Sequence, residues 1–124
     1  ETVEMSKANR DELMNAYDNT IVYTDYLIHS VIEVLRKVKD RNCCMFYISD
    51  HGESLGENNL YMHGVPMMMA PREQIEIPFI VWNADKKLGI KDIKEAGQYH
   101  IFHSVLRFLD VESPIYDEKM NIFE

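Results

Sequence analysis

The sequence predicts an α/β fold, and three observations support this class. A long stretch near the start has helical periodicity, the stretches 43–49 and 77–82 are almost continuously apolar, and a second helical stretch follows at 99–109. Helices that alternate with fully apolar strands are typical of sheets covered by helices on both faces. At 124 residues, of which 46% are hydrophobic, the chain can build a core and forms one domain at most.

The first helix is predicted over about 10–38. Its apolar residues recur in alternating steps of four and three, which is the pattern of one buried helix face. Neither glycine nor proline interrupts this stretch, and Lys37, Lys39 and Arg41 favour the negative end of the helix dipole. The stripe consists of Tyr17, Ile21, Ile28, Val31, Leu35 and Val38, with Thr24 as its one polar member.

The two strands are predicted at "CCMFYIS", 43–49, and "IPFIVW", 77–82. Neither alternates apolar with polar residues, which favours parallel strands between helix layers. Two strands make an incomplete sheet, because a typical sheet has about four to six. We therefore expect residues 1–124 to be the C-terminal part of a larger α/β domain. The alternative is that further strands lie near "KLGI" or "PIYDE".

Charge and composition exclude some classes of function. The net charge of −8 argues against a nucleic-acid partner, which needs a basic face. No apolar run approaches the roughly 20 residues that a membrane-spanning helix needs, and no signal peptide is recognisable. Cys43 and Cys44 are adjacent, and neighbouring cysteines rarely form a disulfide with each other because the required geometry strains the peptide. We expect both to behave as small buried apolar residues.

A long segment, 50–76, separates the two strands. Segments of this length inside a domain usually carry function. Gly52, Gly56 and Gly64 permit tight turns in it, and Pro66 and Pro71 restrict its far side.

Asp50 and His51 stand where the first strand ends, and ligands of α/β sheets gather beyond strand ends. Along a regular strand the two side chains would point apart, but a turn at Gly52 would let both face one ion. A carboxylate oxygen with an imidazole nitrogen suits zinc, while manganese or iron remain alternatives. The competing interpretation is a turn aspartate beside a hydrogen-bonded imidazole.

The other candidates are weaker. His63 lies in the same segment and would be a third ligand or a group that contacts substrate. His100 and His103 share a helix face, where a helix-surface or packing role is favoured over metal binding. Ser54 is the one local hydroxyl near the expected site, and Glu53 and Ser54 could orient ligands from behind.

Three segments together resemble the phosphoethanolamine transferases that modify lipopolysaccharide, which belong to the alkaline phosphatase and sulfatase superfamily. The most specific of them contains Asp-His-Gly-Glu-Ser-Leu-Gly-Glu-Asn followed by His-Gly. The resemblance implies part of an α/β/α sandwich of the sulfatase type. The segments are "AYDNTIVYTDYLI", "YISDHGESLGENNLYMHGVPMMMAPREQIEIPFIVW" and "FHSVLRFLDV".

The resemblance also implies a function. It implies zinc ligands at Asp50 and His51, and a catalytic group at His63 that contacts the transferred phosphate or a second zinc. A threonine would take phosphoethanolamine from phosphatidylethanolamine, and lipid A or the lipopolysaccharide core would receive it. The implied location is the inner membrane of a Gram-negative bacterium, with the catalytic domain in the periplasm.

Several parts of the family pattern do not match any segment of this sequence. The family's threonine nucleophile, its glutamate ligand and its membrane helices lie upstream of the matched segments, so no nucleophile is assigned; Thr20 and Thr24 lie outside that pattern. We therefore expect this chain to need the N-terminal half of the same protein for activity and for tight zinc binding. Alternatives are a sulfatase, phosphoglycerol transferase or phosphatase of the superfamily or, remotely, a non-enzymatic receiver-like module.

Overall fold

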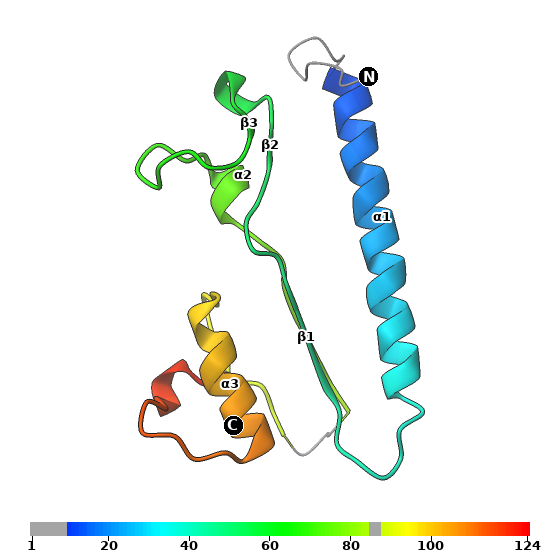
Figure 1. The fold of residues 1–124 in the computed structure, drawn as a ribbon, viewed down its shortest axis with the longest axis vertical. Coiled ribbons are helices and arrows are strands. Elements are labelled where there is room, and N and C mark those ends of the chain that lie inside the picture. Colours follow the sequence, from blue (N-terminus) through cyan, green and yellow to red (C-terminus); the bar gives the residue numbers. More distant parts are fainter. Residues whose placement is uncertain (1–9, 85–87) are drawn as a thin grey trace. The chain divides into compact units, whose positions relative to one another are not determined.

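The computed structural model describes residues 10–84 and 88–124. The chain divides into two compact units, Glu1–Val31 with Ser49–Pro78 and Ile32–Ile48 with Phe79–Glu124. In chain order the elements are α1, β1, the short elements β2, η2, β3 and α2 of the long segment, then β4, α3 and η3 (Figure 1). The predicted order of helix, strand, long segment, strand and helix is confirmed, with additional short elements inside the segment.

Helix α1 spans Arg10–Leu35 and is the longest element (Figure 1). Asp11 and Glu12 in its first turn favour the positive end of the helix dipole. It ends three residues before the predicted Val38, because the backbone bonds at Lys37 and Val38 reach back only three residues, as in a closing turn. Within the described residues, no helix is long and apolar enough to span a bilayer.

Only part of the predicted apolar stripe of α1 is protected from solvent. Tyr17, Thr24, Ile28 and Leu35 are half-buried, whereas Ile21, Val31 and Val38 of the same stripe are exposed. The exposed apolar side chains of α1 also include Val22, Tyr23, Tyr26, Leu27 and Val34.

Strands β1, Cys44–Ile48, and β4, Phe79–Asn83, pair in the register Cys44↔Asn83 to Ile48↔Phe79. The pairing is antiparallel, so the predicted parallel arrangement is wrong. The intervening segment leaves at Ile48 and returns at Phe79, its partner in the register, so the chain re-enters the sheet at the same end. Continuous apolar runs indicate burial and do not determine strand direction.

Neither strand is fully buried. Every residue of β1 is half-buried, and Ile80 of β4 is exposed. In the described part of the chain this sheet has two strands. Cys43 and Cys44 are free thiols and only half-buried, which corrects the expectation of buried cysteines.

The core of the second unit forms around the C-terminal segment. Phe123 is 0% exposed and Ile122 is 2% exposed. The Phe123 ring packs edge-on against Phe46 of β1, with ring centroids 5.9 Å apart, and lies 6.1 Å from Phe108. Aromatic pairs in such geometry add to the stabilisation from burial.

Backbone pairing fixes this C-terminal segment. The Lys91 N–H donates to the Ile122 carbonyl at 2.8 Å, and the Glu124 N–H donates to the Gly89 carbonyl at 3.0 Å. These bonds flank an isolated bridge between Ile90 and Phe123. The alternative of a strand near "KLGI" is thus realised as a single bridge, with Lys87 outside the described residues. No strand forms at 114–118 in the described structure.

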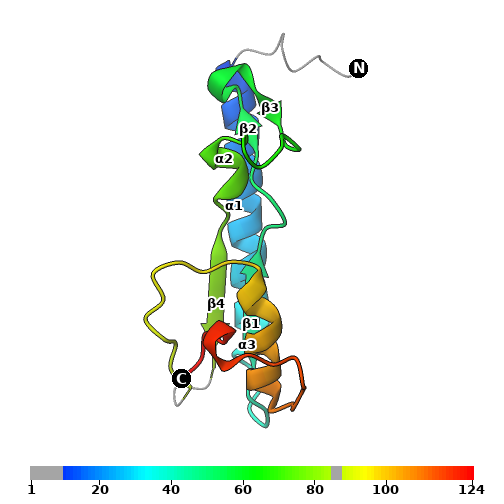
Figure 2. The same cartoon turned by 90° about the vertical axis from the view of Figure 1, so that its left-hand side faces the viewer.

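Helix α3 spans Tyr99–Leu109, as predicted, and lies beside the short helix η3, Glu118–Met120 (Figures 1 and 2). Ser104 on α3 is fully buried and satisfied twice. Its hydroxyl donates to the His100 carbonyl at 2.6 Å and accepts from the Ile122 N–H at 3.1 Å. A buried hydroxyl with both bonds made costs little, so α3 is anchored to the C-terminal segment.

Replacing Phe123 with alanine should destabilise the protein by about 3–5 kcal/mol, because the change removes a buried aromatic ring and leaves a cavity. Urea unfolding measures this loss. Phe102→Ala on α3 is the matched control, since Phe102 is 45% exposed and should cost much less. Equal losses for the two variants would contradict the placement of the core at Phe123.

Glu118 should give the stability a pH dependence. Hydrogen bonds from Tyr116, Lys91 and Asn121 lower the pKa of Glu118 from its ordinary 4.5 to about 2. The folded state therefore binds fewer protons than the unfolded state between these values, so the contribution is present above about pH 4.5 and is lost as the pH falls towards 2. The free energies of unfolding of the wild type and of Glu118→Gln, measured as a function of pH, should converge at low pH. A difference between the two that stays constant with pH would contradict this role of Glu118.

Candidate metal centre

The chain turns immediately after β1, where Asp50 and His51 were predicted to face one ion. The Ser49 hydroxyl donates to the His51 carbonyl at 2.6 Å, and the His51 N–H donates to Asp50 Oδ1 at 3.0 Å. The turn brings Asp50 Oδ2 to 3.7 Å from His51 Nε2. The two side chains therefore converge, as the prediction of a turn at this point required.

The tautomer of His51 follows from its second ring nitrogen. Nδ1 lies 2.9 Å from the Gly52 carbonyl, and a carbonyl oxygen only accepts, so Nδ1 carries the hydrogen. In the neutral ring the lone pair is then on Nε2, the atom near Asp50. An imidazole held by a carbonyl in this way is the usual arrangement of a metal ligand. A cation between Nε2 and the carboxylate would stabilise the pair.

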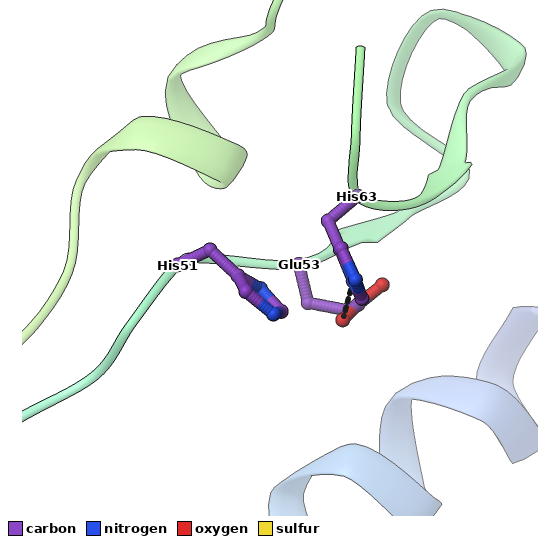
Figure 3. Close-up of side chains that lie close together, drawn as sticks. All are labelled: His51, Glu53 and His63. Atoms are coloured by element: carbon purple, nitrogen blue, oxygen red, sulfur yellow. Dashed lines mark hydrogen bonds and ion pairs between the residues drawn. The ribbon is translucent and has the colours of Figure 1, made fainter.

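A second carboxylate and a second imidazole lie beside His51. The His63 and His51 rings stack with centroids 3.6 Å apart and an interplanar angle of 29°. Glu53 Oε2 lies 3.1 Å from His63 Nδ1 (Figure 3). One potential ligand atom from each of His51, Glu53 and His63 lies within 4.8 Å of the others. These three residues are called the His-Glu-His cluster below.

A short hairpin creates this proximity. β2, Ser54–Leu55, pairs antiparallel with β3, Tyr61–Met62, in the register Ser54↔Met62. Continuing that register by one residue places Glu53 opposite His63, which follows β3 directly. Directly opposed residues of an antiparallel pair have side chains close enough to interact. The hairpin register is therefore what brings the distant His63 to the strand end.

Tight backbone turns shape the hairpin. Gly56 has φ 114°, and Asn58 and Asn59 in η2, Glu57–Asn59, have φ 52° and 58°. Glycine and asparagine are the residues that adopt such angles most readily. Met62 has φ 67° immediately before His63. A positive φ at a larger side chain is uncommon and is typical of constrained functional segments.

Gly52 is required for space rather than for an unusual φ. Its N–H donates to the Gln74 carbonyl at 3.1 Å, and a Cβ at this position would collide with the Glu73 carbonyl oxygen. Glu73 and Gln74 belong to the short helix α2, Arg72–Ile75. The backbone of α2 therefore packs directly against the backbone between His51 and Glu53.

The structure brings two of the three predicted site residues into one cluster and leaves the third beside it. His51 and His63 come together, while Asp50 contacts His51 and lies outside the His-Glu-His cluster. Glu53, for which the sequence suggested only a supporting role, is a full member of the cluster. The available signal was the two-residue spacing of His51 and Glu53, because alternate residues of an extended segment share a side.

The remaining candidates have other roles. His100 Nδ1 accepts from the Gly97 N–H at 3.1 Å, and His103 Nδ1 accepts from the Asp117 N–H at 2.9 Å, which supports the predicted packing role. Ser54 is 1% exposed and its hydroxyl accepts from Gln74, so it is not accessible as a nucleophile. Burial raises the pKa of the Cys44 thiol to about 11, so this thiol stays protonated and is a poor metal ligand.

The donor set fits a divalent cation of the zinc type. Two imidazoles and the carboxylates of Asp50 and Glu53 are donors that zinc accepts at about 2.0–2.2 Å, and tetrahedral ligand atoms at such distances are about 3.3–3.6 Å apart. The 3.7 Å between Asp50 Oδ2 and His51 Nε2 is close to this value. Asp50 is 86% exposed and can adjust to an ion at little cost.

Comparison with known proteins identifies the family. Residues 1–111 match the sulfatase family. The chain belongs to the sulfatase family. This sulfatase chain is 46% identical over 118 residues to the phosphoethanolamine transferase EptA of Helicobacter pylori. The alignment covers 91% of this chain and 22% of that protein, so the chain spans about a fifth of the relative's length.

Two solved structures resemble the chain. The C-terminal periplasmic domain of the phosphoethanolamine transferase EptC from Campylobacter jejuni matches with a TM-score of 0.86 and 40% identity, covering 97% of this chain and 40% of that one. The integral membrane protein lipooligosaccharide phosphoethanolamine transferase A from Neisseria meningitidis matches at 0.88 and 36%, covering 97% and 25%. These similarities confirm the predicted sulfatase-like α/β fold and the resemblance to phosphoethanolamine transferases.

Gly52→Ala should destabilise the protein by roughly 1–3 kcal/mol, because the added methyl group collides with the Glu73 carbonyl and the backbone must move. Urea unfolding measures the change. Gly89→Ala is the matched control: Gly89 does not have a positive φ, and the atoms nearest its would-be Cβ belong to the flexible Glu124 side chain, which can move away. If the control lost as much stability, close packing would not be what Gly52 provides.

Proposed function

We propose that this chain is the C-terminal part of the catalytic domain of a zinc-dependent phosphoethanolamine transferase. The observation that carries the proposal is the His-Glu-His cluster next to Asp50, directly after a sheet strand. Membership in the sulfatase family and the similarity to transferases named for this reaction give the reaction class.

The proposed donor is phosphatidylethanolamine, and the proposed acceptor is lipid A or the lipopolysaccharide core. Support comes from the relative from Neisseria meningitidis, which is named a lipooligosaccharide phosphoethanolamine transferase. We also propose that the protein containing this chain is anchored in the inner membrane of a Gram-negative bacterium through helices outside the chain, with this domain in the periplasm. A solved relative is described as a periplasmic domain and another as an integral membrane protein.

Asp50 and His51 are the proposed zinc ligands. The Nδ1–H of His51 is held by the Gly52 carbonyl, which leaves Nε2 as the coordinating atom. The other carboxylate oxygen of Glu53 would supply a further ligand while Oε2 keeps its contact with His63. Bound zinc would supply positive charge that offsets charge building on the phosphate oxygens and would favour the ionised form of an attacking hydroxyl.

His63 is the proposed catalytic residue. Its Nδ1 faces Glu53 at 3.1 Å, so the carboxylate orients the ring. Nε2 is then the atom available to donate a hydrogen bond to the transferred group or to deliver a proton to the leaving oxygen. The nucleophile and further ligands would come from other segments of the longer protein, with which this chain would complete the site.

Substituting His51 or His63 with alanine in the full-length protein tests this function. His51→Ala should weaken zinc binding and abolish transfer, while His63→Ala should keep most zinc and lower the rate by about 10²–10⁴-fold, as expected for loss of a proton-transfer group. Transfer of phosphoethanolamine from phosphatidylethanolamine to lipid A measures the rate, and zinc titration measures binding. His29→Ala, at an exposed position of α1, is the control.

Metal removal supplies the second arm. A chelator should abolish transfer, and added zinc should restore it. Full activity after verified removal of the metal, or transfer that is insensitive to His51→Ala, would refute the proposal. Hydrolysis of aryl sulfates in preference to phosphatidylethanolamine would assign the chain to a sulfatase instead.

A further inference from the structure

Gln74 is a buried polar residue on a short, otherwise exposed helix. It is 7% exposed, whereas its neighbours Glu73 and Ile75 on α2 are exposed. Burying an amide is unfavourable unless its donor and acceptor are both satisfied. The proposed reaction does not use this residue. Its contacts therefore need a separate explanation.

The side chain and the backbone carbonyl of Gln74 bond the segments that carry the His-Glu-His cluster, while its N–H donates to the Pro71 carbonyl at 3.0 Å. Its side-chain Nε2 donates to Ser54 Oγ at 2.8 Å. Its Oε1 accepts from the Val65 N–H in a longer bond of 3.4 Å, and its backbone carbonyl accepts from the Gly52 N–H at 3.1 Å.

The three partners of Gln74 in these segments bracket the cluster. Gly52 lies between His51 and Glu53, Ser54 follows Glu53, and Val65 is two residues after His63. One residue thus bonds both arms of the hairpin that bring the cluster together. A displacement of either arm would break a bond to the same buried amide.

The hairpin needs such support. β2 and β3 pair through only Ser54↔Met62 and Leu55↔Tyr61, and an isolated hairpin is at best marginally stable in water. Met62 also holds a positive φ just before His63, a conformation that persists only when surrounding contacts impose it. The Gln74 side chain adds a cross-link at the end of the hairpin where His63 leaves it.

We propose that Gln74 is the positioning residue of the candidate metal centre: its amide ties Ser54 to Val65 and so holds Glu53 and His63 at their observed separation. This inference rests on the proposed function for its metal, while the tie itself is a property of the chain. Glutamine suits the position because one planar amide both donates and accepts. A carboxylate keeps an acceptor for Val65, and an apolar side chain keeps neither bond.

The test uses the full-length protein with the substitution Gln74→Met. Methionine conserves the side-chain volume and removes both hydrogen bonds of the Gln74 side-chain amide. Glu73→Met, at the exposed neighbour on the same helix, is the matched control. Zinc titration of the metal-free protein, below the unfolding temperature of each variant, should show affinity about 10–100-fold weaker for Gln74→Met, as typical when a residue that orients ligands is lost. Gln74→Glu should recover part of this loss.

Hydrogen exchange of the metal-free protein is the second readout. The amides of 61–65 should exchange faster in Gln74→Met than in Glu73→Met, because the acceptor for the Val65 N–H is gone. If Gln74→Met does not fold, Ser54→Ala removes the acceptor of the Gln74 Nε2 bond and should also weaken zinc affinity, with a smaller increase of exchange at 61–65 because the Val65 N–H keeps its acceptor.

The outcomes separate this inference from the proposed function. Zinc affinity and exchange in Gln74→Met equal to those of the control would overturn the role of Gln74 and leave the transferase assignment intact. A wild-type protein that neither binds zinc nor transfers phosphoethanolamine would overturn the assignment, and exchange at 61–65 would then decide the positioning role by itself.

Discussion

The candidate centre depends on the register of a hairpin with only two residue pairs. Ser54 opposite Met62 places Glu53 opposite His63, and the stacked rings of His51 and His63 follow from that placement. A shift by one residue would turn the alternate side chains to the other face. Such a short ladder cannot specify its register alone, so the left-handed turn residues and the bonds to α2 must contribute. The geometry of the site is thus set mainly by the turn residues and by the hydrogen bonds to α2 around a hairpin of two residue pairs.

The surroundings of the cluster combine close backbone packing with exposed ligand atoms. Gly52 lets the backbone of α2 approach the turn, and buried Ser54 and Gln74 satisfy each other behind it. Asp50 and His63 remain open to solvent. The supporting bonds are therefore shielded from water, while the candidate ligand atoms stay accessible.

The second unit is organised by different forces. Phe123 is enclosed by Phe46 and Phe108, and the buried polar groups near it are paired with backbone groups. Asn121, also fully buried, bonds the Phe123 backbone through both its amide nitrogen and oxygen. Apolar burial supplies the stabilisation here, and the polar side chains determine the path of the C-terminal segment.

The amino-acid sequence alone determined the two long helices, the positions of the two main strands, and Asp50, His51 and His63 as candidates. Helical periodicity and apolar runs are local signals, and the Asp-His-Gly motif identifies a strand end without any knowledge of pairing. Strand direction, the entry of Glu53 into the cluster and the tie through Gln74 were decided only by tertiary structure. Each depends on which distant segments meet, and that is set by the path of 49–78 and by backbone packing that no local pattern encodes.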